Sequence, residues 1–155
     1  MKERIWTSDI IDTTRTIRNA IIKGTKQYLL RARHSEVEIP EYFHNVRIYD
    51  QLWRLFKARK TNDLSLGSIS MRLEEGTELV KWATGKPGPT VSDLKGDKRH
   101  DICVWISDRP YFVIETKKFG NRYGVFDKDI KRLNSVVKGR GKHVPDFSIV
   151  AFHGH

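Results

Sequence analysis

Two apolar runs, RHDICVWI at residues 99–106 and YFVIETKK at residues 111–118, decide the fold of this chain. Both are rich in β-branched and aromatic residues, and a short turn separates them, so they predict neighbouring strands. Charged residues interrupt them: Asp101 opens the first run, and Glu115 and Lys117 close the second. Because residues two apart on a strand point to the same face, Glu115 and Lys117 should project together.

The face on which Asp101 lies depends on how the two strands are connected. Residues directly opposite on antiparallel strands share a face, so Asp101 joins Glu115 only if the paired residue numbers have an even sum. A three-residue connection over residues 108–110 would place Asp101 opposite Lys117 and meet this condition. A two-residue loop would need a β-bulge to do the same. We therefore expect either the three-residue connection or a bulge.

The composition is that of an ordinary globular protein. A chain of 155 residues can bury its own core as one domain, and 38% hydrophobic with 31% charged residues differs from a disordered segment. No apolar run approaches the roughly 18 residues of a membrane span, and the N-terminus lacks a signal-peptide pattern. We therefore expect a cytoplasmic protein without a membrane partner. A single cysteine, Cys103, excludes a disulfide framework and a cysteine-based zinc site.

The charge is strongly and unevenly basic. The formal net charge is +10, and the segment from Lys117 to Lys142 holds nine basic residues but only two acids. Such a distribution favours a polyanionic partner, whose phosphates would give salt-sensitive affinity.

Periodicity predicts an α/β fold. The expected elements are a helix at 7–33, a helix opening at the capping-box residue Ser35 or at Pro40 and ending near 57, strands at 68–73, 100–107 and 111–118, a helix at 127–138, and a strand at 147–152. Residues 85–98 are expected to form a long loop. Three consecutive strands predict an antiparallel meander, and the helix that follows predicts a parallel last strand.

Apolar stripes predict the buried face of each helix. They comprise Ile10, Ile17, Ile21 and Tyr28 in the first helix, Ile39, Phe43, Val46, Trp53 and Phe56 in the second, and Ile130, Leu133 and Val137 in the last.

Two carboxylates beside an ammonium group suggest a reaction. Asp101 and Glu115 would give hard oxygen ligands for Mg²⁺ or Mn²⁺, with water and a substrate phosphate in the other positions. Such a cation could activate a water. Lys117 would position or help deprotonate that water, or neutralise the developing charge.

The spacing of these residues resembles a known signature. Asp101, thirteen further residues and then Glu115-Thr116-Lys117 resemble the PD-(D/E)xK, or restriction-endonuclease-like, nuclease superfamily. The resemblance covers about residues 35–152 and implies a helix–three-strand meander–helix–strand core with a mixed sheet flanked by helices. The chain length and the first predicted helix add the expectation of one domain over 1–155, with an extra N-terminal helical extension at 1–34 before a core at 35–155. The resemblance also implies Mg²⁺-dependent (or Mn²⁺-dependent) endonuclease cleavage of DNA.

The resemblance assigns roles by position. Asp101 and Glu115 would bind the metal, the Thr116 backbone carbonyl could complete its coordination, and Lys117 would be catalytic. His100 replaces the proline of the full pattern, and we expect it to be exposed. A further acid is often present upstream: Glu36 is our choice, and the alternatives are Glu38, Glu41, Glu74 and Glu75.

Basic residues near the signature are candidates for contact with the DNA backbone. They are Lys118, Arg122, Lys128, Lys131 and Lys138, of which the last three should lie on the outer side of the helix at 127–138. We expect DNA rather than RNA as the partner. A homodimer, additional domains and a longer parent chain are all compatible with the sequence.

Other interpretations stay open. The acid-x-Lys tripeptides at 93–95 and 129–131 lie in a loop and a helix, so only Glu115-Thr116-Lys117 occupies a strand beside an acid. Glu115 and Lys117 could instead form a surface ion pair. The same fold could also be a catalytically inactive module that binds nucleic acid or a protein through its basic face, or a toxin–antitoxin-type interaction domain.

Overall fold

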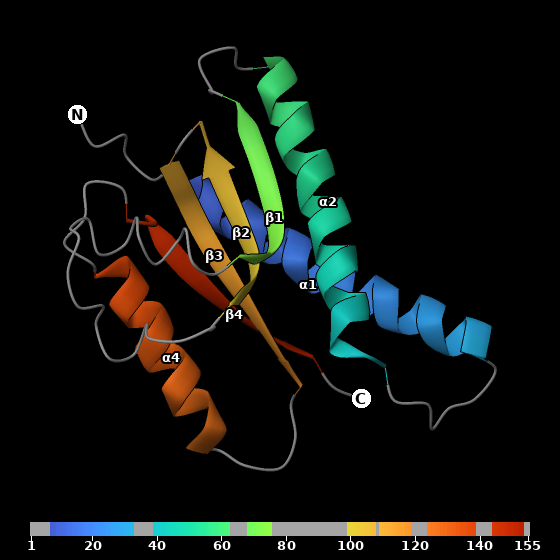
Figure 1. The fold of residues 1–155 in the computed structure, drawn as a ribbon. Coiled ribbons are helices and arrows are strands. Elements are labelled where there is room, and N and C mark those ends of the chain that lie inside the picture. Colours follow the sequence, from blue (N-terminus) through green and yellow to red (C-terminus); the bar gives the residue numbers. More distant parts are fainter. Residues whose placement is uncertain are drawn as a thin grey trace. The chain divides into compact units, whose positions relative to one another are not determined.

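The structure is a computed structural model that describes residues 7–32, 39–62, 68–75, 99–107, 109–118, 124–138 and 144–153. These residues form an α/β fold with three helices and a four-stranded mixed sheet (Figure 1). The chain divides into two compact units, Met1–Leu64 and Ser65–His155. The single domain over 1–155 stays a prediction, and the expected loop at 85–98 lies outside the described residues. No described helix is both long and apolar enough to cross a membrane.

The first unit contains α1 (Thr7–Ala32) and α2 (Glu41–Asn62). The predicted first helix is confirmed, and it continues through Gly24, where an added Cβ would lie 3.3 Å from the Arg47 side chain. The second helix starts after Pro40, whose carbonyl accepts a hydrogen bond from the Phe43 amide at 3.0 Å. This start agrees with the Pro40 alternative and with the tolerance of proline at a helix start.

The buried faces of these helices differ in part from the predicted stripes. The buried residues are Thr13, Ile17, Ala20 and Gly24 in α1, and His44, Asn45, Ile48, Leu52 and Phe56 in α2. Val46, Trp53 and Ile10 are exposed, so their predicted burial is wrong. Apolar residues lie on more than one side of α2. Helical periodicity alone therefore could not distinguish the buried stripe through Ile48 and Leu52 from the predicted one through Val46 and Trp53.

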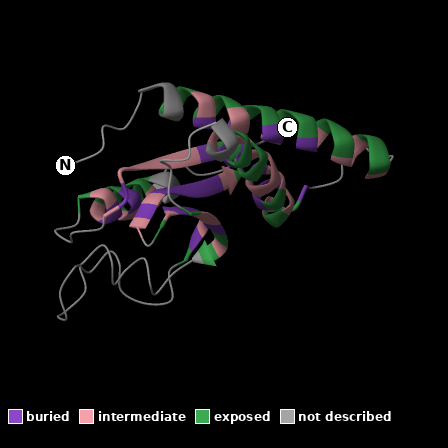
Figure 2. Ribbon diagram, turned by 90° about the horizontal axis from the view of Figure 1, so that it is seen from above, coloured by how far each residue is buried: buried purple, intermediate pink, exposed green. Residues whose placement is uncertain are grey.

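The second unit is built on a sheet with strand order β1-β2-β3-β4. The strands are β1 (Ile69–Glu75), β2 (His100–Ile106), β3 (Arg109–Lys118) and β4 (Phe147–His153). β1, β2 and β3 pair antiparallel, and β4 pairs parallel with β3. Both the meander and the parallel last strand are thus confirmed. Figure 2 shows that many residues of the sheet strands are buried.

Helix α4 (Gly124–Val137) precedes β4 and packs against one face of the sheet. The cluster beneath it consists of Cys103, Trp105, Val113, Leu133 and Val136. The helix begins at Gly124 instead of Asp127. Ile130 is 41% exposed, and Val136 is fully buried while Val137 is only partly so, which corrects two of the three predicted core positions. The helix is therefore rotated relative to the predicted stripe.

Truncating Val136 should loosen the packing of α4 on the sheet. Val136→Ala removes two buried methyl groups next to Cys103 and Val113, and we expect the free energy of unfolding to fall by about 2 kcal/mol. Urea unfolding measures this change. Val137→Ala is the matched control, because Val137 is only partly buried, and an equal loss from both variants would contradict the observed helix orientation.

A β-bulge sets the register between β2 and β3. Ile106 pairs with Arg109, so only two residues connect the strands, and the three-residue connection is wrong. The register shifts between Val104 and Trp105, which leaves Tyr111 as the extra residue on β3. Beyond the shift, Ile102 pairs with Ile114, and one further step places Asp101 opposite Glu115. The bulge thus puts both carboxylates on one face, as the parity argument required.

Candidate active site

Asp101 lies where the pairing of β2 with β3 ends. One carboxylate oxygen, Oδ2, accepts hydrogen bonds from the Thr116 backbone amide at 2.6 Å and from the Thr116 hydroxyl at 3.0 Å. Burial raises the pKa of Asp101 above its usual 3.8; the nearby Glu115 charge acts in the same direction, and the hydrogen bonds from Thr116 oppose it. The fold therefore holds Asp101 firmly but stabilises its charge poorly.

Glu115 lies on β3 and is only 3% exposed. Its Oε1 lies 2.5 Å from Nη2 of Arg132 and 3.1 Å from Nζ of Lys117, and its Oε2 lies 3.6 Å from Nδ1 of His100. Burial is the largest single influence and raises the pKa of this carboxyl. His100, Arg132 and Lys117 together outweigh it and lower the pKa from 4.5 to about 2. Glu115 is therefore a buried carboxylate whose charge is well compensated.

Asp129 completes a closed set of ion pairs. It lies on α4, 3.6 Å from Nζ of Lys117 and 3.3 Å from Nη2 of Arg132. Glu115, Lys117, Asp129 and Arg132 thus alternate in charge, and each acid contacts both bases. We call these four residues the ion-pair ring. Its net charge is zero, which explains how four ionised groups coexist where the most exposed side chain is only 22% accessible.

Sequence reasoning missed three of the residues around Glu115: His100, Asp129 and Arg132. His100 is 2% exposed, so its predicted exposure is wrong. Asp129 and Arg132 lie three apart on the side of α4 that carries Leu133 and Val136. A core stripe through Leu133 and Val136 would have placed both charged residues toward the sheet.

The structure separates the candidates for the further acid. Glu36 and Glu38 lie outside the described residues, and Glu41 begins α2 in the first unit. Glu75 pairs with His100. The pairs on either side of Glu74 place it opposite Asp101, but its φ is 53° and its half-exposed carboxylate contacts Arg99 at 3.5 Å. Of the two candidates on β1, Glu74 is the one that lies opposite Asp101 in register.

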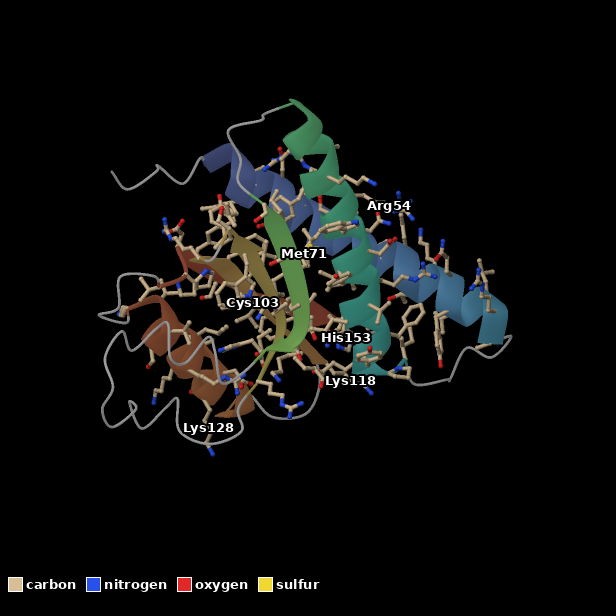
Figure 3. The ribbon with its side chains drawn as sticks, turned by 45° about the horizontal axis from the view of Figure 1, so that its top comes forward. Arg54, Met71, Cys103, Lys118, Lys128 and His153 are labelled. Atoms are coloured by element: carbon tan, nitrogen blue, oxygen red, sulfur yellow. The ribbon has the colours of Figure 1, made fainter. Side chains whose placement is uncertain are left out.

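The predicted phosphate-contacting lysines are exposed. Lys118 ends β3, and Lys128 projects from α4 away from the sheet (Figure 3). Lys131 and Lys138 are exposed on and just beyond the same helix. Lys118 points to the opposite face from Lys117, because neighbouring strand residues alternate. Arg122 lies outside the described residues.

The donor atoms suit a hard divalent cation. Within the described residues, no group of three or more His, Cys, Asp or Glu side chains is arranged to hold a metal. Mg²⁺, however, commonly uses one or two carboxylates with water and substrate phosphate. Oε2 of Glu115 is buried and accepts no hydrogen bond from the described residues. In Asp101, both hydrogen bonds from Thr116 go to the same oxygen, Oδ2. Asp101 and Glu115 therefore fit such an ion, although Glu115 is also engaged by the ion-pair ring.

Comparisons of the chain with protein-family models, curated proteins and solved structures found no match. The interpretation of the site therefore rests on its own residues. These are two carboxylates in register on adjacent strands, one lysine beside the second carboxylate, and a partly buried arginine from the covering helix.

Proposed function

We propose that this protein is a metal-dependent nuclease with a restriction-endonuclease-like core, which hydrolyses phosphodiester bonds of DNA. One observation carries the proposal: the bulge in β3 brings Asp101 opposite Glu115, with Lys117 two residues further on the same face. Without the bulge, a two-residue connection would have placed the carboxylates on opposite faces. The bulge interrupts the hydrogen bonding between β2 and β3, and it aligns the partly buried carboxylates of Asp101 and Glu115. Bulges and partly desolvated acids of this kind are both common at functional sites.

The residues divide the chemistry among them. Asp101 and Glu115 would hold Mg²⁺ or Mn²⁺, with the Thr116 carbonyl as a further oxygen ligand. When bound, such a cation lowers the pKa of a coordinated water and offsets charge on the reacting phosphate. The Lys117 ammonium lies 3.1 Å from Glu115 and 3.6 Å from Asp129, on the face that carries both proposed metal ligands. We therefore assign Lys117 to stabilising negative charge on the phosphate in the transition state.

The exposed lysines supply the DNA-binding surface of the proposal. Removing Lys128, Lys131 and Lys138 together by alanine substitution should weaken DNA binding at low salt. It should also reduce the slope of log K against log salt concentration by about 2 to 3 units, since each lost phosphate contact removes about 0.9. Fluorescence anisotropy from 50 to 200 mM salt measures this slope. An unchanged slope would show that the DNA lies elsewhere.

Cleavage assays test the proposed activity. The wild-type chain should nick plasmid DNA with Mg²⁺ or Mn²⁺ and lose this activity in EDTA, and parallel incubations with single-stranded DNA and RNA define the substrate class. Glu115→Ala should abolish cleavage. Asp146→Asn and Arg109→Met are controls for charge loss, because these two residues pair with each other at the opposite end of β3 from Glu115. Cleavage that survives Glu115→Ala would overturn the assignment of the site.

A second candidate function has one observation in its favour. Within the ion-pair ring, Lys117 and Arg132 already balance the charge of Glu115, so Glu115 needs no metal ion to be stable. This arrangement favours a fold that binds nucleic acid without cleaving it. Salt-sensitive DNA binding without cleavage of plasmid, single-stranded DNA or RNA would support this inactive module over the nuclease.

A further inference from the structure

Arg132 occupies a position that the nuclease signature does not explain. It reaches from α4 to the sheet face that carries Glu115, and its side chain is 13% exposed. Nη2 lies 2.5 Å from Oε1 of Glu115 and 3.3 Å from Oδ1 of Asp129. Nevertheless, neither Nε nor Nη2 makes a well-aligned hydrogen bond to the described residues. Among the described residues, charge attraction from Glu115 and Asp129 thus accounts for the position of the guanidinium.

This position brings Arg132 into conflict with a cation on Glu115. A divalent ion bound there would meet a guanidinium and an ammonium that already contact the same oxygen, Oε1. Like charges at this separation repel strongly in a buried site. A metal can therefore bind well to Glu115 only if Arg132 finds a different anion.

A substrate phosphate is the anion that the geometry suits. The planar guanidinium donates paired hydrogen bonds to phosphate oxygens, and it keeps its charge in every state of the site. Asp129, three residues earlier on α4, can hold Arg132 at the sheet after Glu115 is released. Asp129 is thus a positioning residue for Arg132.

We propose that Arg132 exchanges Glu115 for the substrate phosphodiester, so that metal and nucleic acid bind cooperatively. In the free chain Arg132 competes with the metal for Glu115. In the complex it contacts the phosphate, and Glu115 becomes available to the metal. This inference rests on the proposed function, because it needs both a metal and a phosphodiester at the site. By linkage, each ligand tightens the binding of the other by the same factor.

Mn²⁺ binding tests the exchange with a readout independent of cleavage. Electron paramagnetic resonance gives the Mn²⁺ affinity of the folded chain with and without a phosphorothioate duplex, which carries the phosphate charge and resists hydrolysis. We expect the duplex to tighten Mn²⁺ binding about tenfold in the wild type, within the usual range of coupling between sites. Arg132→Met should bind Mn²⁺ about fivefold more tightly than the wild type without the duplex, and the duplex should tighten its binding by less than about twofold.

Two further variants make the result specific. Arg109→Met is the matched control, because Arg109 pairs with Asp146 at the opposite end of β3 from Glu115 and carries the same charge. It should retain the wild-type enhancement. Arg132→Lys keeps the charge and so preserves folding if the methionine variant unfolds. It should bind Mn²⁺ more tightly than the wild type without the duplex, because an ammonium has no planar fork to hold Glu115.

The outcomes separate this inference from the proposed function. Mn²⁺ that binds the wild type equally with and without the duplex overturns the exchange and leaves the metal site intact. Wild-type affinities in both Arg132 variants, or loss of the enhancement in Arg109→Met, overturn the role of Arg132. A wild-type chain that binds no Mn²⁺ in either condition overturns the metal site, and the exchange with it.

Discussion

Lys117→Ala should slow DNA cleavage by about a thousandfold while both carboxylates of the proposed metal site stay in place. The ammonium lies 3.1 Å from Glu115, on the face that also carries Asp101, and no other lysine of β3 points to that face. The alanine variant retains both carboxylates, so metal binding should persist. The loss should therefore appear in the single-turnover rate at saturating DNA, with little change in affinity.

Lys118→Ala is the informative comparison for this result. The two lysines are neighbours on one strand, but Lys118 is exposed and faces the other way. Its removal should weaken DNA binding and leave the single-turnover rate at saturating DNA unchanged. Quench-flow measurements on a labelled duplex distinguish rate from affinity. If both variants lower only the affinity, Lys117 contributes to binding and the nuclease assignment loses its catalytic lysine.

The strands of the second unit could be predicted from sequence because their signals are local. The apolar runs around Ile102 and Phe112 identified the two central strands, and the helix before Phe147 predicted the parallel last strand. Strand alternation alone put Glu115 and Lys117 together. These inferences need only the period-2 geometry of a strand and the length of its connections.

The register needed information that the sequence does not carry. A three-residue connection and a two-residue connection with a bulge both put Asp101 on the face of Glu115. The first would place Asp101 opposite Lys117, and the observed register places it opposite Glu115. The bulge leaves Tyr111 as the extra residue on β3, and its carbonyl accepts a hydrogen bond from the Asp146 amide at 2.8 Å. This contact joins distant parts of the chain, so periodicity within one segment could not reveal it.

The ion-pair ring was missed for a related reason. A helix with apolar residues at positions 130, 133, 136 and 137 offers two overlapping stripes, and packing against the sheet selects the one through Leu133 and Val136. This rotation of about one residue turns Asp129 and Arg132 toward Glu115. Charged residues are usually placed on the outer face of a helix in sequence analysis, because burial of a single charge is costly. Here four charges compensate one another.

The two acids of the proposed metal site should affect stability in opposite directions. Glu115→Gln should lower the free energy of unfolding by about 3 kcal/mol at pH 7, because it leaves the partly buried Lys117 and Arg132 with Asp129 as their shared acid. Asp101→Asn should raise it by up to about 1 kcal/mol, because the fold disfavours the charge of Asp101 while the amide can still accept from Thr116. Urea unfolding in EDTA measures both changes without a contribution from bound metal.

The contributions of Glu115 and Asp101 to the free energy of unfolding should also change with pH in opposite directions, because folding lowers the pKa of Glu115 and raises that of Asp101. The pKa of Glu115 falls from 4.5 to about 2 on folding, so its stabilising contribution is complete above pH 4.5 and is lost as the pH falls toward 2. The deficit of Glu115→Gln should therefore shrink over that interval. The pKa of Asp101 is raised above 3.8, so its charge destabilises the fold above the raised value, and the advantage of Asp101→Asn should vanish on acidification.

Asp146→Asn, at the other end of β3, is the control for acid loss in general. If Asp101→Asn destabilises the chain as much as Glu115→Gln does, Asp101 is primarily a structural acceptor for Thr116. If both variants match the wild type, the ion-pair ring does not compensate Glu115 in solution.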